Sequence, residues 1–239
     1  MTGEPSANPD KRLEIVVDGV EYQRIPIRTR LLLHGEDLTA FVVEHAGPVL
    51  RQGDLLFVSE KIVAIAQGRA YPVDSIRPRR LAAWLSRHVT KTSHGIGLGM
   101  PETMEMALRE VGTPRILLAA AVSVVSKALG RTGDFYRVAG PKARGIDGPT
   151  EGTIPPFNSQ VVLVPERPDR VAAELKAALG VGEVAIVDVN DFGANILGAT
   201  IPKREQDRLA LILADNPLGQ GHESTPLGVV RPAPGSDRR

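Results

Sequence analysis

The stretch QVVLVPERPDRVAAELKAALGVGEVAIVDV, residues 160–189, constrains the fold more than any other part of the sequence. Its apolar runs predict a strand over 160–164 and a strand over 184–189, with a helix over about 169–179 and a glycine stop between them. A helix that connects two strands predicts that these strands pair in parallel. We therefore expect an α/β (α+β) fold, with a mixed sheet, flanking helices and two interlocked lobes.

The patterns before this stretch predict further elements. Residues 13–27 read as a hairpin, because two β-rich runs flank the turn pair Asp18-Gly19. A helix is expected after residue 37, ended by Gly47-Pro48, and a strand over 55–58 is followed by a polar break and a second apolar run. Residues 130–156 have little periodicity and are expected to form a long loop or several short turns. The apolar run 116–125 is too short for a bilayer, which needs about 20 residues, and is expected to be buried core.

Composition excludes several classes of function. The 239 residues are 42% hydrophobic, which is enough for a sizeable core. We expect a single catalytic domain over residues 13–230, possibly in two lobes. Residues 1–12 and 231–239 are expected to be disordered tails. A net charge of +1 and an aromatic content of 4% argue against nucleic acid and membrane partners. Cysteine is absent, which excludes disulfides, thiolate zinc sites and a cysteine nucleophile. The polar start shows no signal peptide, so we expect a cytoplasmic protein.

Three oxygen-bearing side chains follow the last predicted strand of the opening stretch. Asp188, Asn190 and Asp191 stand at its carboxyl end, where ligands bind in open α/β sheets. Hard cations such as Mg²⁺ and Mn²⁺ take oxygen ligands, commonly one or two carboxylates together with phosphate oxygens. Asn and Asp before Gly193 also form ordinary turns. The residue types leave the site and the turn equally open.

Other polar segments are weaker candidates. Asp147, Thr150 and Glu151 lie among glycines, which would let backbone approach a ligand, although these residues taken alone favour an ordinary Asp-Gly turn. Glycines at 95, 97 and 99 precede a predicted helix start and could hold phosphate, but they match neither common glycine-rich fingerprint. A polar stretch before the last predicted strand could line a site or form a surface loop; its candidates are Asp215, Asn216, Gln220, His222 and Glu223. The histidines show no metal-ligand spacing, and no GxSxG elbow supports serine hydrolase chemistry.

Five segments in order resemble one family. They are IPIRTRLLLHGEDL, GDLLFVSEKIVAIAQGR, GID at 145–147, LVPERPDRVAAELKAAL and VDVNDFG, and they span most of residues 25–231. This pattern resembles the coenzyme F-420:L-glutamate ligase (gamma-glutamyl ligase) family. The resemblance implies a ligase that joins the amine of L-glutamate to a carboxylate on a deazaflavin precursor. It also implies GTP (with ATP as the alternative), Mg²⁺ or Mn²⁺, an acyl phosphate route that needs no protein nucleophile, and a homodimer.

The resemblance also assigns roles to residues, one by one. The metal-binding aspartate of the family falls on Asp147, and its acidic pair of metal ligands falls on Asn190 and Asp191. Asp147 and Asp191 are thereby the expected catalytic residues, and the resemblance implies that they meet at a shared metal–phosphate site. The remaining assignments are Gln220 as a further metal ligand and Ser59, Glu60, Lys61 and Thr150 as nucleotide contacts.

The sequence departs from the family pattern at the places where ligands would bind. A second family lysine is replaced by Ile65, GPT follows Asp147 where RSN is usual, and Asn190 stands where an aspartate is usual. These differences keep a second interpretation open, a nucleotide- or metabolite-binding protein on the same scaffold without ligase turnover.

Overall fold

A computed structural model describes residues 5–89, 97–131, 133–150, 153–190, 193–219, 221–233 and 235. The chain divides into two compact units, one made of residues 1–67 and 165–239 and the other of residues 68–164. We call them unit 1 and unit 2 and describe each by itself.

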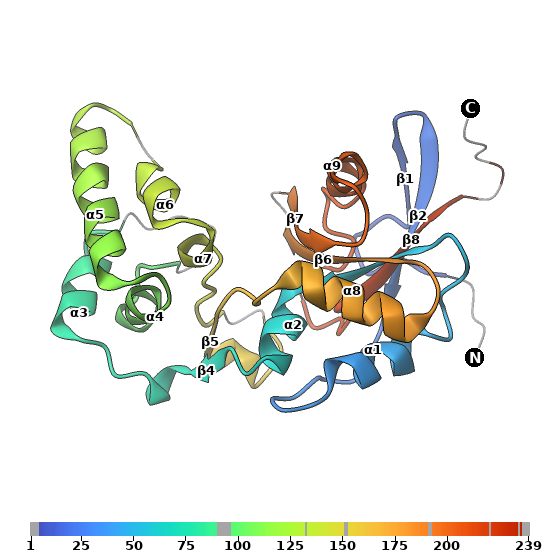
Figure 1. Ribbon diagram of the computed structural model, residues 1–239, viewed down its shortest axis with the longest axis horizontal. Helices are drawn as coiled ribbons and strands as arrows, with labels where there is room; N and C mark the ends of the chain where they lie inside the picture. Colours follow the sequence, from blue (N-terminus) through green and yellow to red (C-terminus); the bar gives the residue numbers. More distant parts are fainter. Residues whose placement is uncertain are drawn as a thin grey trace. The chain divides into compact units, whose positions relative to one another are not determined.

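Unit 1 is a mixed sheet covered by helices on both faces (Figure 1). In the described part of the chain, the sheet has the strand order β1-β2-β8-β3-β6-β7. Its strands are β1 (Glu14–Val17), β2 (Val20–Ile27), β3 (Leu55–Ser59), β6 (Glu183–Asn190), β7 (Gly193–Ala199) and β8 (Leu227–Pro232). Its helices are α1 (Leu38–Ala46), α2 (Glu60–Ala66), α8 (Pro168–Leu179) and α9 (Lys203–Ile212). This mixed α/β arrangement confirms the predicted fold class.

The two faces of the sheet bury alternate side chains of the central strands. Phe57 and Val187 pack with Leu209 and Ile212 of α9 on one face. Figure 1 shows α1, α2 and α8 on the opposite face. Because both faces are covered, residues 184–187 of β6 are all fully buried, which explains why this strand reads as a continuous apolar run.

The predicted parallel pairing exists, but with a different partner. β6 pairs in parallel with β3, with Ser59 opposite Val187. The strand expected over 160–164 is β5 (Gln160–Val162), which pairs antiparallel with β4 (Ala70–Pro72) in a separate two-stranded sheet of unit 2. The β-α-β prediction was therefore wrong in its first strand. The chain leaves unit 2 after residue 164 and enters unit 1 before α8, so the two strands on either side of that helix belong to different sheets.

Local signals in unit 1 were more reliable. Asp18 and Gly19 both have positive φ, 52° and 76°, and close the β1–β2 hairpin with Val17 opposite Val20. α8 ends at Gly180, whose φ of 69° is the left-handed geometry of a helix stop. The ordered structure extends into both expected tails. β8 continues to Pro232, and buried Asn8 donates hydrogen bonds to the carbonyls of Pro217 and Leu218.

Unit 2 packs helices around its own core, beside the small β4–β5 sheet (Figure 1). Its helices are α3 (Arg80–Ser86), α4 (Pro101–Val111), α5 (Thr113–Ala128), α6 (Asp134–Ala139) and α7 (Pro141–Arg144), with 3₁₀ turns at Val73–Ser75 and Phe157–Ser159. α6 and α7 correct the expectation of an irregular stretch over 130–156. Each is too short to show a helical period, and glycines separate them.

Two long helices of unit 2 differ in burial. α4 buries Met104, Met106 and Leu108 in the core. α5 buries only Ile116, Ala119 and Ser126, so the prediction that the run 116–125 is buried core was wrong for most of its large side chains. No single helix in the described residues is long and apolar enough to cross a membrane. α4 and α5 pass that test only as a pair, which is bent by 117° at the break between them.

Candidate functional site

The carboxyl ends of β3 and β6 lie side by side in unit 1 because the two strands are parallel neighbours. Ser59 ends β3 and is also the N-cap of α2, where its hydroxyl accepts a hydrogen bond from the Lys61 backbone N–H at 3.4 Å. Asp188 and Asn190 end β6, one and three positions beyond Val187, which is the register partner of Ser59. The fold thus gathers two groups of predicted residues at one end of the sheet.

The segment before β8 reaches the same end, because β8 runs antiparallel to β3. The Ser59 backbone N–H donates to the Pro226 carbonyl at 2.9 Å. The end of β2 is tied in as well, since the Thr29 backbone N–H donates to the Ser224 carbonyl at 2.9 Å and the Ser224 hydroxyl donates to the Thr29 carbonyl at 2.9 Å. Polar groups from four adjacent strands therefore converge on one edge, which is where α/β sheets bind ligands.

The loop that leads into β8 is shaped by a carboxylate. A Cβ at Gly219 would lie 3.1 Å from the Glu223 carboxyl group, and one at Gly221 would lie 2.8 Å from it. The two glycines therefore leave room for this side chain to lie against the loop. Asn216 is fully buried; its side-chain amide donates to the Gly219 carbonyl at 3.1 Å, and its Oδ1 has no hydrogen-bond partner among the described residues. Gln220, the predicted metal ligand of this loop, lies outside the described residues.

Sequence reasoning passed over one cation at this end of the sheet. Arg28 follows β2 directly, is exposed, and makes no hydrogen bond or ion pair with any described residue. Its neighbour Arg30 differs, because it pairs with Glu36 at 2.5 Å and lies 5.0 Å from the centre of the Phe41 ring. The signal for Arg28 was its position: it is the first residue after β2, and the end of β2 and Ser59 are both bonded to the segment 224–226 that leads into β8.

Asp147 belongs to unit 2, where the backbone fixes it against β5. Its N–H donates to the Val162 carbonyl and its carbonyl accepts from the Val162 N–H, both at 2.9 Å. Its side chain is exposed, while Ile146 before it is buried in the core. Thr150, three residues on, donates its hydroxyl to the Gly148 carbonyl at 3.2 Å. Asp147 and Asn190 lie in different units, so their predicted meeting stays a prediction.

Two further expectations fall partly outside the described residues. Asp191, an expected catalytic residue, and Glu151 are both in undescribed positions. Of the glycine-rich turn before α4, Gly97 and Gly99 are described but Gly95 is not. A Cβ at Gly97 would lie 3.3 Å from the Tyr136 hydroxyl, so this turn packs closely on a side chain of unit 2. Phosphate binding there stays a prediction.

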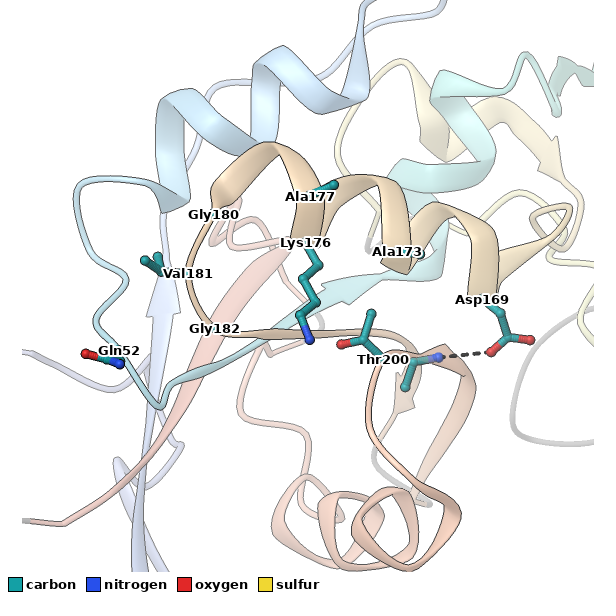
Figure 2. Close-up of a pocket in the computed structure, with 10 residues that line it drawn as sticks. Gln52, Asp169, Ala173, Lys176, Ala177, Gly180, Val181, Gly182 and Thr200 are labelled. Atoms are coloured by element: carbon teal, nitrogen blue, oxygen red, sulfur yellow. Dashed lines mark hydrogen bonds between the residues drawn. The ribbon is translucent and has the colours of Figure 1, made fainter.

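One pocket of unit 1 lies away from these residues. It has a volume of about 990 Å³ and runs along α8, between Gln52 and the glycine turn 180–182 that leads into β6 (Figure 2). It therefore opens at the amino ends of β3 and β6. The Lys176 amine beside it already pairs with Glu183 at 2.6 Å. None of the predicted site residues lines this pocket, and we place the candidate site at the opposite strand ends.

Two charged groups of unit 1 with a perturbed pKa, Glu183 and Arg231, lie near the amino ends of β3 and β6, away from the candidate site. Burial alone would raise the pKa of the Glu183 carboxyl, but hydrogen bonds from Lys176 and Thr200 lower it below its ordinary value. The hydrogen bonds that the Arg231 guanidinium donates to the Asp54 carboxylate raise the pKa of Arg231, against the effect of burial. Both pairs stabilise the framework of unit 1.

The oxygen atoms at the carboxyl ends of the strands fit a cation that is shared with a phosphate ligand better than a metal ion held by protein ligands alone. Within the described ranges, no three His, Cys, Asp or Glu side chains come together as a metal site. Asp188 and Asn190 supply a carboxylate and an amide oxygen, and Asp191 follows in sequence. Mg²⁺ in nucleotide sites uses only one or two carboxylates, with phosphate oxygens and water completing its shell. An oxygen-donor pair of this kind suits an ion that arrives with a phosphate ligand.

These features define an α/β protein with polar and charged groups gathered at the carboxyl ends of its central strands. Comparison with known proteins narrows this class. The family model for F420-0:Gamma-glutamyl ligase matches residues 26–191. The chain belongs to this family. The match includes Ser59, Lys61, Asp147, Asn190 and Asp191, and ends before the loop that leads into β8.

A relative supports the same assignment. The chain is similar to a protein named Coenzyme F420:L-glutamate ligase from Methanopyrus kandleri, with 32% identity over 158 residues. This alignment covers 65% of the chain and 51% of the relative, so the chain spans about half the length of the relative it matches.

Proposed function

We propose that the chain is a gamma-glutamyl ligase that joins the amine of L-glutamate to a small carboxylate, by resemblance the coenzyme F-420 precursor. The family membership supports this proposal, and so does the name of the relative from Methanopyrus kandleri. The observation that carries it furthest is structural. Ser59, assigned to the nucleotide, ends β3, and Lys61 follows it in the first turn of α2; Asn190, assigned to the metal, ends β6, the parallel neighbour of β3.

The proposed reaction has two balanced steps. A carboxylate oxygen of the acceptor takes the γ-phosphoryl group of GTP, which yields an acyl phosphate and GDP. The amine of L-glutamate then attacks the carbonyl carbon, phosphate leaves with the C–O bond electrons, and an amide remains after the amine loses a proton to solvent. Neither step needs a nucleophile from the protein, which is consistent with a chain that has no cysteine. A bound Mg²⁺ or Mn²⁺ would neutralise phosphate charge.

The protein's part in this reaction is to bind and orient charged groups. We propose Asp147, Asn190, Asp191 and Gln220 as oxygen ligands for the divalent ion, and Ser59, Glu60, Lys61 and Thr150 as contacts of the nucleotide. For Asp147 and Thr150 the assignment rests on the resemblance alone. ATP is the alternative nucleotide, and the resemblance also supports a homodimer in the cytoplasm.

We add Arg28 to the proposed nucleotide contacts. Position 65, where the family has a second lysine, is occupied by Ile65, which is 2% exposed and packs in the interior of unit 1. That position cannot supply a cation to a phosphate here. Arg28 is an exposed cation without a partner among the described residues, at the same end of the sheet as Ser59. It is therefore the residue we expect to contribute the missing positive charge.

The buried Ile65 also supports the second candidate function. A protein that lost a phosphate contact could bind a nucleotide or metabolite on this scaffold without turning it over. The Tm of the protein, measured with GTP, ATP or neither, each with and without Mn²⁺, shows whether a nucleotide binds. A ligand at 100 times its dissociation constant adds about 2.7 kcal/mol, or roughly 5–10 °C for a protein of this size. The ligase proposal expects a shift that requires both a nucleotide and the metal.

Variants assign the shift to residues. Arg28→Ala is expected to reduce the nucleotide-dependent shift, whereas Arg51→Ala, an exposed arginine before the amino end of β3, should leave it unchanged. Asp191→Asn is expected to weaken metal binding and so to reduce the part of the shift that depends on the metal. If neither nucleotide shifts the transition of the unaltered protein, nucleotide-dependent ligation is rejected and the metabolite-binding function remains.

A further inference from the structure

A buried asparagine ties the segment before β1 into unit 1. Asn8 is 7% exposed, and its side-chain amide donates to the Pro217 carbonyl at 3.2 Å, to the Leu218 carbonyl at 2.8 Å and to the Thr225 hydroxyl at 2.8 Å. These three acceptors lie more than 200 positions away in the sequence. They belong to the loop that leads into β8, of which residues 216–219 and 221–226 are described. We call these residues the β8 loop.

The acceptors that Asn8 bonds depend on it. Pro217 and Leu218 are buried, and no backbone N–H in the described part of the chain donates to either of their carbonyls. The Thr225 hydroxyl accepts from Asn8 and donates its own proton to the Leu218 carbonyl at 2.9 Å. A buried carbonyl without a donor destabilises the conformation that buries it. The amide of Asn8 therefore helps to select this conformation of the β8 loop.

The β8 loop has a backbone that needs such support. Asn216 and Ser224 both have a φ of 53°, in the left-handed region that residues other than glycine seldom adopt. Residues with this strain persist where their surroundings fix them. Asn8 bonds the residue that follows each of them, Pro217 after Asn216 and Thr225 after Ser224. It thus restrains the loop next to both strained residues.

The same segment also holds the position at which the loop begins. The Lys11 amine donates to the Asp215 carbonyl at 3.0 Å. Arg24 is fully buried and pairs with the Asp215 carboxylate, and its guanidinium donates to the Arg12 carbonyl at 2.8 Å. Residues 8–12 therefore contact the β8 loop along its length and do not form a loose tail.

Thr225 connects this support to the candidate site. Ser224, on one side of it, accepts the Thr29 N–H at 2.9 Å, and Pro226, on the other side, accepts the Ser59 N–H at 2.9 Å. Thr29 follows Arg28 directly. A shift of Thr225 would therefore move the backbone beside two of the proposed nucleotide contacts, Arg28 and Ser59.

We propose that Asn8 is a positioning residue of the candidate site, which sets Arg28 and Ser59 for the nucleotide by holding Thr225 and the β8 loop. Asn8 is buried, so it acts through the loop without touching the ligand. Asn8 and Thr225 both lie outside the residues 26–191 that the family model matches, and the resemblance assigns no role to either. The inference rests on the proposed function, because it requires a nucleotide to bind at these strand ends.

Hydrogen exchange of the ligand-free protein tests the positioning itself. The backbone amides of Thr29 and Ser59 are direct reporters, since each donates to a carbonyl of the β8 loop. Asn8→Ala should make both amides exchange about tenfold faster, because the loop opens more often. Thr200→Val is the matched control: the Thr200 hydroxyl accepts the Val184 N–H at 2.9 Å at the amino end of β6, so its loss should not affect the Thr29 and Ser59 amides.

Nucleotide affinity tests the consequence for the site. Isothermal titration with GTP or ATP, in the presence of Mn²⁺, should give a Kd about tenfold higher for Asn8→Ala than for the unaltered protein, a change of about 1.4 kcal/mol. Thr225→Val removes the hydroxyl and should have the same effect, whereas Thr225→Ser keeps it and should bind like the unaltered protein. The double variant Asn8→Ala with Thr225→Val should be little weaker than either single variant, because both remove one shared contact. Thr200→Val should leave the Kd unchanged.

The outcomes separate the role of Asn8 from the ligase proposal. The role of Asn8 is overturned if Asn8→Ala leaves the exchange of the Thr29 and Ser59 amides unchanged. It is also overturned if the unaltered protein and Asn8→Ala bind the nucleotide equally well, or if Thr200→Val weakens binding as much. If Asn8→Ala does not fold, as judged by circular dichroism, the comparison of Thr225→Val with Thr225→Ser decides in its place. An unaltered protein that binds neither nucleotide overturns the proposed function, and with it the role of Asn8.

Discussion

The buried ion pair between Asp54 and Arg231 offers a sharp test of how unit 1 is held together. Asp54 is 3% exposed and accepts two hydrogen bonds from the Arg231 guanidinium, at 2.8 Å from Nε and 2.5 Å from Nη2. It also accepts the Arg51 backbone N–H at 2.8 Å. The pair thus ties the end of β8 to the turn before β3.

Removing the cation alone should be costly. Arg231→Met keeps most of the side-chain volume but leaves the Asp54 carboxylate buried without its counter-ion, which costs about 3–5 kcal/mol. For a protein of this size that corresponds to a drop of roughly 6–20 °C in Tm, at about 2–4 °C per kcal/mol. Equilibrium unfolding in urea, followed by circular dichroism, measures the free energy directly.

The sign of a second substitution gives the decisive control. Asp54→Asn in the Arg231→Met background removes the uncompensated charge, so the double variant should be more stable than the single one. Lys203→Met provides a matched comparison, because the Lys203–Asp207 pair lies on the surface with both side chains more than 60% exposed, and its loss should cost at most about 1 kcal/mol. If Arg231→Met costs no more than Lys203→Met, the buried pair does not hold unit 1 as argued.

Two further predictions concern packing and pH. Gly228→Ala should lower the stability of unit 1 by about 1–3 kcal/mol, since the new Cβ would lie 2.3 Å from the buried Phe57 ring. Adding Phe57→Leu should recover part of that loss in the same urea assay. If the losses of stability from the two single substitutions simply add in the double variant, the contact is contradicted. Burial alone would raise the pKa of Glu105 and Glu110, but hydrogen bonds from Arg79 and Arg109 to Glu105, and from Lys142 and Arg69 to Glu110, lower both below the ordinary value of 4.5. At a pH between the pKa of these carboxyls in the folded protein and that in the unfolded chain, the unfolded chain binds more protons. The two carboxylates therefore add to the free energy of unfolding above about pH 5, and this contribution is lost as the pH falls through their pKa in the folded protein. Glu105→Gln should flatten the acid limb of a stability–pH curve, and an unchanged limb would refute the assignment.

Local chemistry made much of unit 1 predictable from the sequence. The Asp18-Gly19 turn and the Gly180 helix stop depend on backbone preferences of a few residues, and each was found where the sequence predicts it. The strand with which β6 pairs could not be read in the same way. Its true partner, β3, lies more than 120 residues earlier in the sequence, and nothing local to either strand distinguishes it from the nearer β5.

Burial of apolar runs was the second limit of the sequence. The run 116–125 has the composition of a core helix, yet Leu118, Val124 and Val125 are exposed. Composition predicts that such a helix is covered, but not whether its own chain or another molecule covers it.

The candidate site could also be predicted only in part from the sequence. Asp188 and Asn190 were predicted from residue type at a strand end, whereas Arg28 emerges only when the sheet places the ends of β2 and β3 on either side of β8.

The proposed reaction forms a glutamyl amide at the expense of a nucleotide. Mass spectrometry tests it directly, in a reaction that contains the protein, the deazaflavin precursor, ¹⁵N-labelled L-glutamate, Mn²⁺ and either GTP or ATP, with Asp191→Asn as the matched control. We expect a product that carries the labelled nitrogen in a new amide, with one nucleoside diphosphate released per amide formed, and no product with Asp191→Asn. Nucleotide binding in the thermal assay without any labelled amide would contradict the ligase assignment for this acceptor and favour a binding protein on the ligase scaffold.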